Sequence, residues 1–518
     1  MLGRPPVGEL PTPDRSSRRD LLARRVCRWA LGGIVVLSLG RAVLHFAYLV
    51  GRFSTPLEAF FLESKMVHLA WRAQHGLGLY PSWHSGPYVA NFFGPIYFEL
   101  VGLIGKAGAV DVDGLFPIAR VVTIASSAAL TILLGVYCGR RWGASAGCLA
   151  ALVSIGARPT VGFGVMARPD TLADLFGFAG FLLALGATRR RLAAGSLLLL
   201  LAIFTKQTTA VYLIAACLAH VWNGRRAAAL GVGSAVVLSA LAIVAAVTLG
   251  GAPGFGPGLV GELGTPRDLA DYRRLLEQFA IFSPDLAVFA LIGLVLWNQR
   301  PTRDRSLATL AIVLLITSLA AAVKKGAGLN YFLCLRTVEA LALATLWTAS
   351  KKAEGVRAWW LAAILAVAGV ALIPSVADAW IQADSAFQQR DYLRGRAGRA
   401  RMRQHRALLR LCEDPAARIL TDSGLLDIHQ GPRTAFADPW LFRLLVNTQR
   451  LEPSAMKSAV EEERYDWIFT TKEIMGADYR DYDFGLPISV IEPARRHYVF
   501  DGWKAGFFQY RPRGRRAP

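Results

Sequence analysis

Residues 189–226 read RRRLAAGSLLLLLAIFTKQTTAVYLIAACLAHVWNGRR, two apolar stretches enclosed between basic clusters. The stretches, 192–205 and 207–222, meet at Lys206. Apolar helices cross the hydrocarbon core of a bilayer, and the Lys and Arg clusters that join them stay on the cytoplasmic side. The segment therefore predicts a pair of transmembrane helices whose basic ends lie inside the cell and whose tip, at Lys206, lies outside.

The same pattern extends over three quarters of the chain. Of the 518 residues, 54% are hydrophobic and only 18% are charged, and the mean hydropathy is +0.37. A soluble protein of this length carries more charge. We therefore predict an all-α polytopic membrane domain of about eleven transmembrane helices, near residues 27–50, 115–138, 142–160, 170–187, 192–205, 207–222, 227–249, 285–298, 306–323, 330–349 and 357–378.

One further apolar stretch, 92–107, is predicted not to cross. It is short, follows Asn91, and contains Glu99 and Lys106. If it crossed, every later basic cluster would lie outside, against the positive-inside rule. We therefore expect a juxtamembrane helix that lies on the membrane within an outer loop at 51–114.

This topology sets the predicted domains. Residues 1–26 are expected to form an uncleaved cytoplasmic tail, because their Pro- and Arg-rich sequence continues into an apolar span without a signal-peptide cleavage site. Residues 27–379 are expected to form the transmembrane domain of a protein integral to the inner or plasma membrane. Residues 380–518 are expected to lie outside the membrane.

The tail from 380 to 518 differs in composition from the rest. A basic amphipathic stretch, Arg390 to Arg410, is followed by short apolar runs at 418–422 and 466–471 that are typical of buried strands. The remaining expected elements are helices at 439–445 and 453–463, and strands at 498–500 and 507–510 that pair around Asp501-Gly502. The tail is thus predicted to be a small extracytoplasmic α/β domain.

The formal net charge of +21 does not indicate nucleic acid as a partner. A basic soluble domain would raise that possibility. Here the Lys and Arg residues lie in short clusters between apolar stretches, which is the distribution that membrane orientation requires. The expected partners are membrane lipids.

Polar residues gather in the segments predicted to face outward. In the first outer loop these are Glu63, the element Gly76-Leu77-Gly78-Leu79-Tyr80, and Tyr88 ahead of Gly94-Pro95. Later outer turns carry Ala167-Arg168-Pro169-Asp170, Phe204-Thr205-Lys206-Gln207 and Gly328-Leu329-Asn330-Tyr331.

The order and placement of these motifs resemble the GT-C superfamily of membrane glycosyltransferases over about residues 27–350. The branch they resemble most is the ArnT- and protein-mannosyltransferase-like one, also described as RgtA/B/C/D-like or family-39-like. The resemblance implies transfer of a sugar from a polyprenyl-phosphate donor to an extracytoplasmic acceptor, a lipid, glycan or protein, with inversion at the anomeric carbon. The sequence departs from that branch at Asn91-Phe92-Phe93-Gly94-Pro95, where a Glu-Lys pair often precedes Pro-Pro. No cofactor is therefore assigned, and a divalent metal stays possible.

The chemistry of such a transfer needs a base for the acceptor hydroxyl and cations for the leaving phosphate. We expect Glu63 to be the catalytic base. The residues expected to bind substrate are His68, Tyr80, Tyr88, Arg168, Asp170, Lys206, Gln207, Lys324, Lys325, Asn330 and Tyr331. The aromatic run Phe92, Phe93, Tyr97 and Phe98 is expected to line the groove for the prenyl chain.

Each of the leading candidates has a plainer interpretation. Glu63 can instead pair with Lys65 or Arg72, which leaves Glu58 as a rival base. Asp170 can serve only as a helix N-cap, and Lys206 can be a lysine that extends to the interface.

Two residues within a predicted span, Arg336 and Glu339, are three positions apart and are expected to satisfy each other. Two other classes of protein also stay open. A polytopic transporter or lipid flippase would carry paired repeats or charges in mid-span. A scaffold would act through its tail alone.

Overall fold

The computed structural model describes residues 15–53, 63–82, 88–261, 264–298, 302–354, 356–436, 438–479, 482 and 485–514. The helices up to residue 394 are α1 (Arg15–Phe53), α2 (Glu63–Gln74), α3 (Ile96–Ala107), α4 (Val112–Trp142), α5 (Ala144–Gly156), α6 (Arg158–Phe163), α7 (Asp170–Ala184), α8 (Arg189–Thr205), η1 (Gln207–Thr209), α9 (Ala210–Trp222), α10 (Arg226–Leu249), α11 (Phe255–Gly261), α12 (Leu269–Phe282), α13 (Pro284–Asn298), α14 (Thr302–Ala321), η3 (Leu329–Phe332), α15 (Leu335–Lys351) and α16 (Val356–Arg394).

A helix is present at each of the eleven stretches predicted to span the membrane. Among the described residues, five helical segments are long and apolar enough for a crossing, and a sixth is counted if α12 and α13, bent by 80° at their junction, form one span. The protein is therefore an integral membrane protein, and the number eleven stays a prediction. Helix α3 has only 12 residues, about 18 Å of helix, which is shorter than the roughly 30 Å of hydrocarbon.

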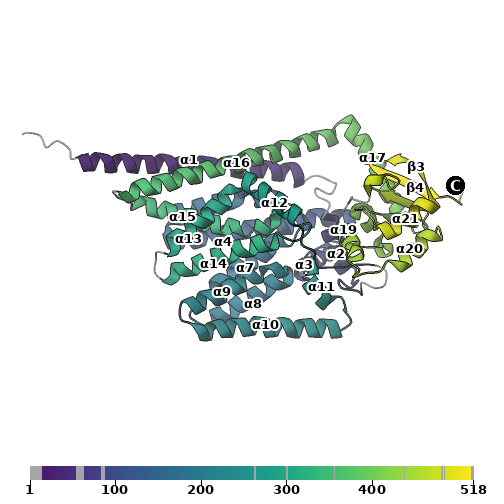
Figure 1. Ribbon diagram of the computed structural model, residues 1–518, viewed down its shortest axis with the longest axis horizontal. Coiled ribbons are helices and arrows are strands. Elements are labelled where there is room, and N and C mark those ends of the chain that lie inside the picture. Colours follow the sequence, from purple (N-terminus) through teal and green to yellow (C-terminus); the bar gives the residue numbers. More distant parts are fainter. Residues whose placement is uncertain are drawn as a thin grey trace, which may run out of the picture.

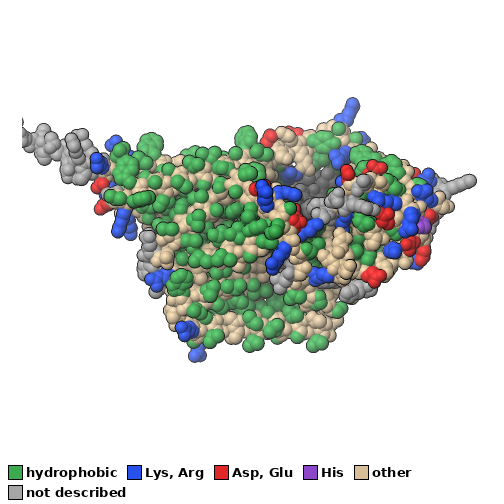
Figure 2. Space-filling model, viewed as in Figure 1, with side chains coloured by type: hydrophobic (Ala, Val, Ile, Leu, Met, Phe, Trp, Pro, Cys, Tyr) green, Lys and Arg blue, Asp and Glu red, His purple; other side chains and the backbone are tan. Residues whose placement is uncertain are grey.

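Figure 1 shows α1 and α16 side by side along one edge of the helical part, with the other long helices beneath them. Figure 2 shows hydrophobic side chains over the middle of this helical part, whereas Lys, Arg, Asp and Glu side chains gather at the right end of the molecule, with a smaller group at the left end. A surface that is apolar over the helices and charged beyond them is what a lipid-embedded domain requires.

The charged end is the predicted small α/β domain. Its elements are α17 (Arg396–Glu413), β1 (Ile419–Thr421), α18 (Gly424–Ile428), η4 (Gly431–Arg433), α19 (Pro439–Asn447), α20 (Ser454–Glu461), β2 (Trp467–Thr470), η5 (Ala477–Tyr479), α21 (Ile488–His497), β3 (Tyr498–Lys504) and β4 (Phe507–Pro512). They surround one sheet of strand order β1-β2-β4-β3, in which β1 and β2 are parallel and β4 is antiparallel to both β2 and β3.

The predicted turn of the last hairpin was wrong. The chain reverses at Ala505-Gly506, where both residues have positive φ (54° and 99°), as a two-residue hairpin turn requires. Asp501-Gly502 lies within β3, at a shift of the strand register between Phe500 and Gly502. Gly502 there accommodates a bulge, which a glycine in a strand often marks.

The α/β domain packs directly on the outer-loop residues. Lys65 Nζ lies 2.6 Å from Asp438 Oδ2, and both side chains are buried. Tyr88 forms an isolated parallel bridge with Phe436, and its ring packs on Phe442 at 5.0 Å. The domain boundary predicted at 379/380 falls inside the continuous helix α16, so the two parts share one long helix.

A buried ionic network crosses the helical part and corrects one expectation. Arg41 of α1 binds both Asp285 of α13 and Glu339 of α15, in the second case at 2.8 Å. Arg336 does not pair with Glu339, because its Nη1 donates to Ser127 and Thr160 instead. Arg41 takes the carboxylate of Glu339 because α1 packs against α15, a contact between distant segments that spacing within one helix does not reveal.

Candidate functional site

Asp170 is the centre of a buried polar cluster at the start of α7. Its Oδ2 accepts from Arg168 Nε at 2.9 Å, and its Oδ1 accepts from Lys206 Nζ at 2.6 Å and from Asn330 Nδ2 at 3.2 Å. Three turns that are far apart in the sequence therefore meet at one carboxylate. The interpretation of Asp170 as an N-cap was wrong, because Pro169 occupies that position and Asp170 binds side chains.

Lys206 is buried and faces inward. Only 5% of its surface is exposed, so the interpretation as a lysine extending to the interface was wrong. Its ammonium lies 5.2 Å from the ring centre of Tyr331, and the ammonium of Lys324 lies 5.7 Å from the same ring. Both are cation–π distances. The basic tips at Lys206 and Lys324 thus meet over one aromatic residue.

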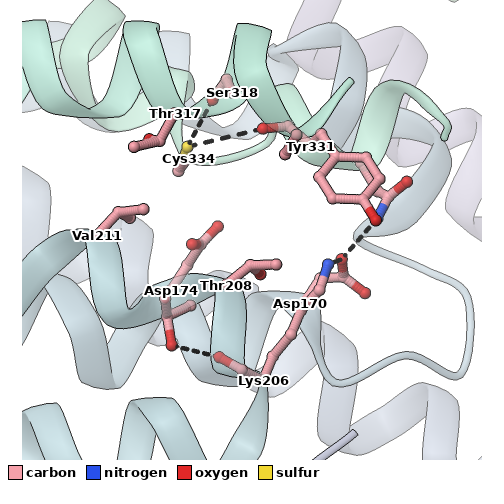
Figure 3. Close-up of a pocket in the computed structure, with 12 residues that line it drawn as sticks. Asp170, Asp174, Lys206, Thr208, Val211, Thr317, Ser318, Tyr331 and Cys334 are labelled. Carbon is pink, nitrogen blue, oxygen red and sulfur yellow. Dashed lines mark hydrogen bonds and ion pairs between the residues drawn. The ribbon is translucent and has the colours of Figure 1, made fainter. Parts of the chain in front are cut away.

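A cavity of about 170 Å³ opens beside this cluster. Figure 3 shows Lys206 and Tyr331 meeting near Asp170 on one side of it, and Thr317, Ser318 and Cys334 on the side opposite Thr208. Its lining consists of Asp170, Asp174, Lys206, Thr208, Thr209, Val211, Thr317, Ser318, Ala321, Asn330, Tyr331 and Cys334. Eight of these twelve side chains carry a carboxylate, a hydroxyl or an amide group, so the cavity can hydrogen-bond a ligand that is rich in hydroxyl groups.

Asp174 was missed by the sequence analysis. It lies one turn after Asp170 on the same face of α7 and lines the same cavity. Among the described residues, the carboxylate of Asp174 accepts one hydrogen bond, from Tyr212 Oη at a long 3.4 Å. A carboxylate within a predicted span was the signal, since such a group is a functional hypothesis by default.

Glu63 lies at the first position of α2 and does not line the cavity. Its carboxylate accepts from Arg120 Nη2 at 2.8 Å and Nε at 3.1 Å, and from the backbone N–H of Ala167 at 2.9 Å. The expected alternative partners were wrong, because Lys65 binds Asp438 and Arg72 donates to the carbonyl of Gly78. Arg120 was also missed; its position near the start of the predicted second span, 115–138, was the signal.

Four other predicted site residues do not line the cavity. Tyr80 donates to the carbonyl of Phe93 at 2.7 Å, and Gln207 donates to the carbonyl of Phe92. Tyr88 belongs to the interface with the α/β domain. The fourth, Lys325, donates its backbone N–H to the carbonyl of Pro266 at 2.8 Å.

His68 lies on α2, and its side chain is buried against the surrounding elements. Burial, with Arg72 nearby, lowers the pKa of His68 to about 3, so the imidazole is neutral. Its ring meets Trp71 edge-on at 6.2 Å. Glu58, the rival base, lies outside the described residues.

An apolar groove of about 580 Å³ lies on the other side of the end of α8. Its lining consists of Leu79, Tyr80, Pro95, Ile96, Glu99, Leu197, Leu200, Leu201, Phe204, Ile243, Val247, Ala252 and Phe255. A second hollow of about 430 Å³ continues between α8 and α10 as far as Arg189 and shares Leu197 and Leu200 with the first. Phe204 faces the groove and Lys206 faces the polar cavity, so the end of α8 separates an apolar site from a polar one.

The aromatic run expected to line a prenyl groove lies elsewhere. Tyr97 and Phe98 are fully buried, and Phe92 is 7% exposed. Tyr97 donates to the carbonyl of Ala119 at 2.9 Å, so it fastens α3 to α4. These side chains form core, and the groove is lined by their neighbours Tyr80, Pro95 and Phe204.

Within the described part of the chain, no three His, Cys, Asp or Glu side chains gather as metal ligands would. Both carboxylate oxygens of Asp170 already accept from cationic side chains. That donor set does not fit a divalent cation, which needs several oxygen ligands.

No protein-family model and no curated protein matches this chain. Solved structures do match. The crystal structures of ArnT from Cupriavidus metallidurans, one bound to undecaprenyl phosphate and one in the apo state, are each 12% identical to it. The first covers 91% of this chain and 97% of its own with a TM-score of 0.54, and the second covers 93% and 98% with 0.55. The apo oligosaccharyltransferase of Archaeoglobus fulgidus, also 12% identical, covers 91% of this chain and 73% of its own with a TM-score of 0.49.

The chain thus has the GT-C fold. The resemblance inferred from the outer-turn motifs is confirmed at the level of fold, over most of the chain.

Proposed function

We propose that this protein is a membrane glycosyltransferase that moves a sugar from a polyprenyl-phosphate donor to an acceptor on the extracytoplasmic side. One observation carries the proposal: a buried cationic cluster at a hydroxyl- and carboxylate-lined cavity adjoins an apolar groove. A donor of this class has the same three parts, namely a phosphate, a sugar and an apolar chain. The ArnT structure with undecaprenyl phosphate bound supports the choice of lipid.

Lys206 and Lys324 are proposed to bind the phosphate. Their ammonium groups lie over the same ring of Tyr331, so an anion near that ring can accept from both. Asp170 holds Lys206 in place, and it also holds Arg168. A preorganised cation stabilises the charge that grows on the phosphate as the glycosidic bond breaks.

The groove along α8 and α10 is proposed to hold the prenyl chain. Its lining is almost entirely apolar, and it begins at Phe204, two residues before Lys206. A lipid whose phosphate lies at Lys206 can therefore extend its chain along α8. Burial of the chain there contributes hydrophobic free energy.

Two carboxylates compete for the role of proton acceptor. Glu63 is proposed from its place in the first outer loop, but both of its carboxylate oxygens already accept hydrogen bonds from Arg120 and it does not line the cavity. Asp174 lies in the cavity lining, where a donor sugar or an acceptor hydroxyl can reach it. The contacts support Asp174, and a base must lie within hydrogen-bond reach of the proton that it takes.

The acceptor is proposed to arrive from the side of the α/β domain. The turn that follows Lys325 lies against that domain. The backbone of Gly326 is so close to the ring of Trp440 that an added side chain would meet that ring. On the proposed topology the N-terminus is cytoplasmic and the domain after α16 is extracytoplasmic, with the outer loop at 51–114 beneath it.

Transfer in vitro tests the proposal. Purified protein is mixed with a panel of labelled polyprenyl-phosphate sugars and with cell-envelope lipids or glycans as acceptors. Transfer of label by the wild-type protein, lost in Lys206→Met, supports it. Movement of the intact lipid between leaflets without glycosidic-bond cleavage would instead identify a flippase.

A further inference from the structure

Helix α17 has two opposite faces. Its buried residues, Gly398, His405, Leu408, Leu409 and Cys412, face the α/β domain. On the other face lie five exposed arginines at alternating spacings of three and four, namely Arg396, Arg399, Arg403, Arg406 and Arg410. This spacing places all five in one row along the helix, here called the arginine row.

The arginine row has no acidic residue within it. Like charges three or four residues apart on a helix destabilise it, and here each arginine has another arginine as that neighbour. Between 390 and 410 the single acidic residue is Asp391, which belongs to α16. Within the part of the chain that the structure describes, none of the five arginines forms an ion pair. Asp113, which Arg406 influences electrostatically, forms its ion pair with His429, whose Nε2 lies 3.5 Å from Asp113 Oδ1. A row of like charges without ion pairs favours the binding of an anionic partner.

The arginine row begins where the lipid-facing surface of α16 ends. Exposed apolar side chains follow α16 as far as Trp380, Ile381 and Phe387, and the half-exposed Tyr392 comes after them. Helix α16 ends at Arg394 and α17 starts at Arg396, with only Gly395 between them. Figure 1 shows α17 turning away from the line of α16 at this joint. Trp and Tyr side chains favour the level of the lipid headgroups, and Tyr392 lies four residues before Arg396, the first arginine of the row.

We propose that the arginine row of α17 binds the phosphate groups of anionic lipid headgroups. Guanidinium groups bind phosphate through two parallel hydrogen bonds, and basic segments next to a transmembrane helix are attracted to anionic membrane surfaces. The apolar surface of α16, directly continuous with the row, favours a lipid over a soluble anion. This surface is separate from the cavity at Lys206 and does not depend on the reaction catalysed there.

The test uses the full chain in nanodiscs of phosphatidylcholine, with and without phosphatidylglycerol. Retained phosphatidylglycerol is counted by native mass spectrometry after release into detergent, at low and high salt. The test variant replaces all five arginines of the row by Gln, which keeps helix propensity. A second variant replaces the same five by Lys. The matched control removes five exposed cations elsewhere on the α/β domain: Lys457, Arg464, Arg496, Lys504 and Arg513 to Gln.

The wild type is expected to retain phosphatidylglycerol over phosphatidylcholine, and the preference should shrink at high salt. The Gln variant should lose about tenfold or more of that preference, and the Lys variant and the control should keep most of it. Thermal unfolding in neutral lipid checks that the Gln variant is folded. The proposal is overturned if the folded Gln variant keeps the wild-type preference, or if the control loses as much. Equal binding of a soluble polyphosphate, with no extra retention of lipid, also overturns it.

Discussion

Lys206 Nζ and Asp170 Oδ1 lie 2.6 Å apart although 36 positions separate them in the chain. Both side chains are about 5% exposed, and Arg168 binds the other oxygen of the same carboxylate. Removing one partner of a buried ion pair leaves an uncompensated charge, which destabilises a protein strongly. This pair therefore fixes the position of Lys206 as well as contributing to the fold.

Replacement of Asp170 by Asn should release Lys206 and Arg168. We expect a loss of about 3 kcal/mol or more in unfolding free energy, because two cations then lack their carboxylate. Denaturant unfolding of the full chain in detergent measures it. Asp384→Asn is the control, since Asp384 is exposed and accepts from Gln388. Equal stability of the two variants would contradict the role given to Asp170.

The two proposed bases predict different effects of substitution. Asp174→Asn keeps the shape of the side chain and removes the proton acceptor, so turnover should fall by about 10²–10⁴-fold while donor binding survives. Glu63→Gln should chiefly lower stability, because it disrupts the buried pair with Arg120. Initial rates and donor affinity are measured on variants shown to be folded.

The opposite result would assign the role of catalytic base to another carboxylate. If Glu63→Gln is folded, binds donor and is inactive while Asp174→Asn is active, then Glu63 is the base. If Glu58→Gln alone is inactive, the base lies in the segment 54–62. If all three variants keep their turnover, none of these carboxylates takes the proton.

The pair Lys65–Asp438 is predicted to hold the α/β domain against α2. Asp438→Asn keeps the cap that Oδ1 provides for the N–H of Leu441 and removes the charge that binds Lys65. Hydrogen exchange should therefore speed up in α2 and less so in α19. Lys457→Met, which breaks an exposed pair with Glu461 at 4.0 Å, is the control. Unchanged exchange in α2 argues against the contact as a clamp.

Asp422 in the α/β domain makes stability depend on pH. Burial raises its pKa to about 7 from an ordinary value of 3.8, against the opposing hydrogen bonds from Thr471 and Tyr479. Between these values the folded carboxyl is protonated and the unfolded one is charged. The contribution of Asp422 to the free energy of unfolding is therefore greatest at low pH and is lost as the pH rises to about 7.

Asp422→Asn should remove that dependence. The thermal midpoint of the wild type should fall relative to that of the variant between pH 5 and pH 8. Each unit of pKa shift is worth about 1.4 kcal/mol, so the relative change should be a few degrees or more. The midpoints of the full chain in detergent, compared at each pH, measure it. Parallel curves for the two proteins would refute the raised pKa.

Local patterns were enough for much of this molecule. Apolar stretches between basic clusters predicted a helix at all eleven positions, and period and flanking residues predicted β1, β2 and α19 within a few positions. The convergence of Arg168, Asp170, Lys206 and Asn330 followed from their shared place at outer turns. Such inferences work because each depends on one segment and its position relative to the bilayer.

Pairings between distant segments were not predictable in the same way. The partner of Glu63 is Arg120, and the partner of Glu339 is Arg41; both arginines lie within apolar helices. Sequence spacing suggests neighbours on the same helix, whereas helix packing decides which buried charges meet. Asp174 was missed for a related reason, since only the packing of α7 against α9 and the approach of α14 turn it toward a cavity.

The central claim is that the cavity at Lys206 receives the phosphate of a prenyl-carried donor. Its most direct test is equilibrium binding of a fluorescent undecaprenyl phosphate to the purified full chain, to Lys206→Met, and to Lys352→Met as a control at an exposed lysine. We predict saturable binding by the wild type and the control, and affinity at least about tenfold weaker in Lys206→Met, since a charge-assisted hydrogen bond in a dry site is worth about 1.5–3 kcal/mol. Equal affinity of all three proteins would contradict the account.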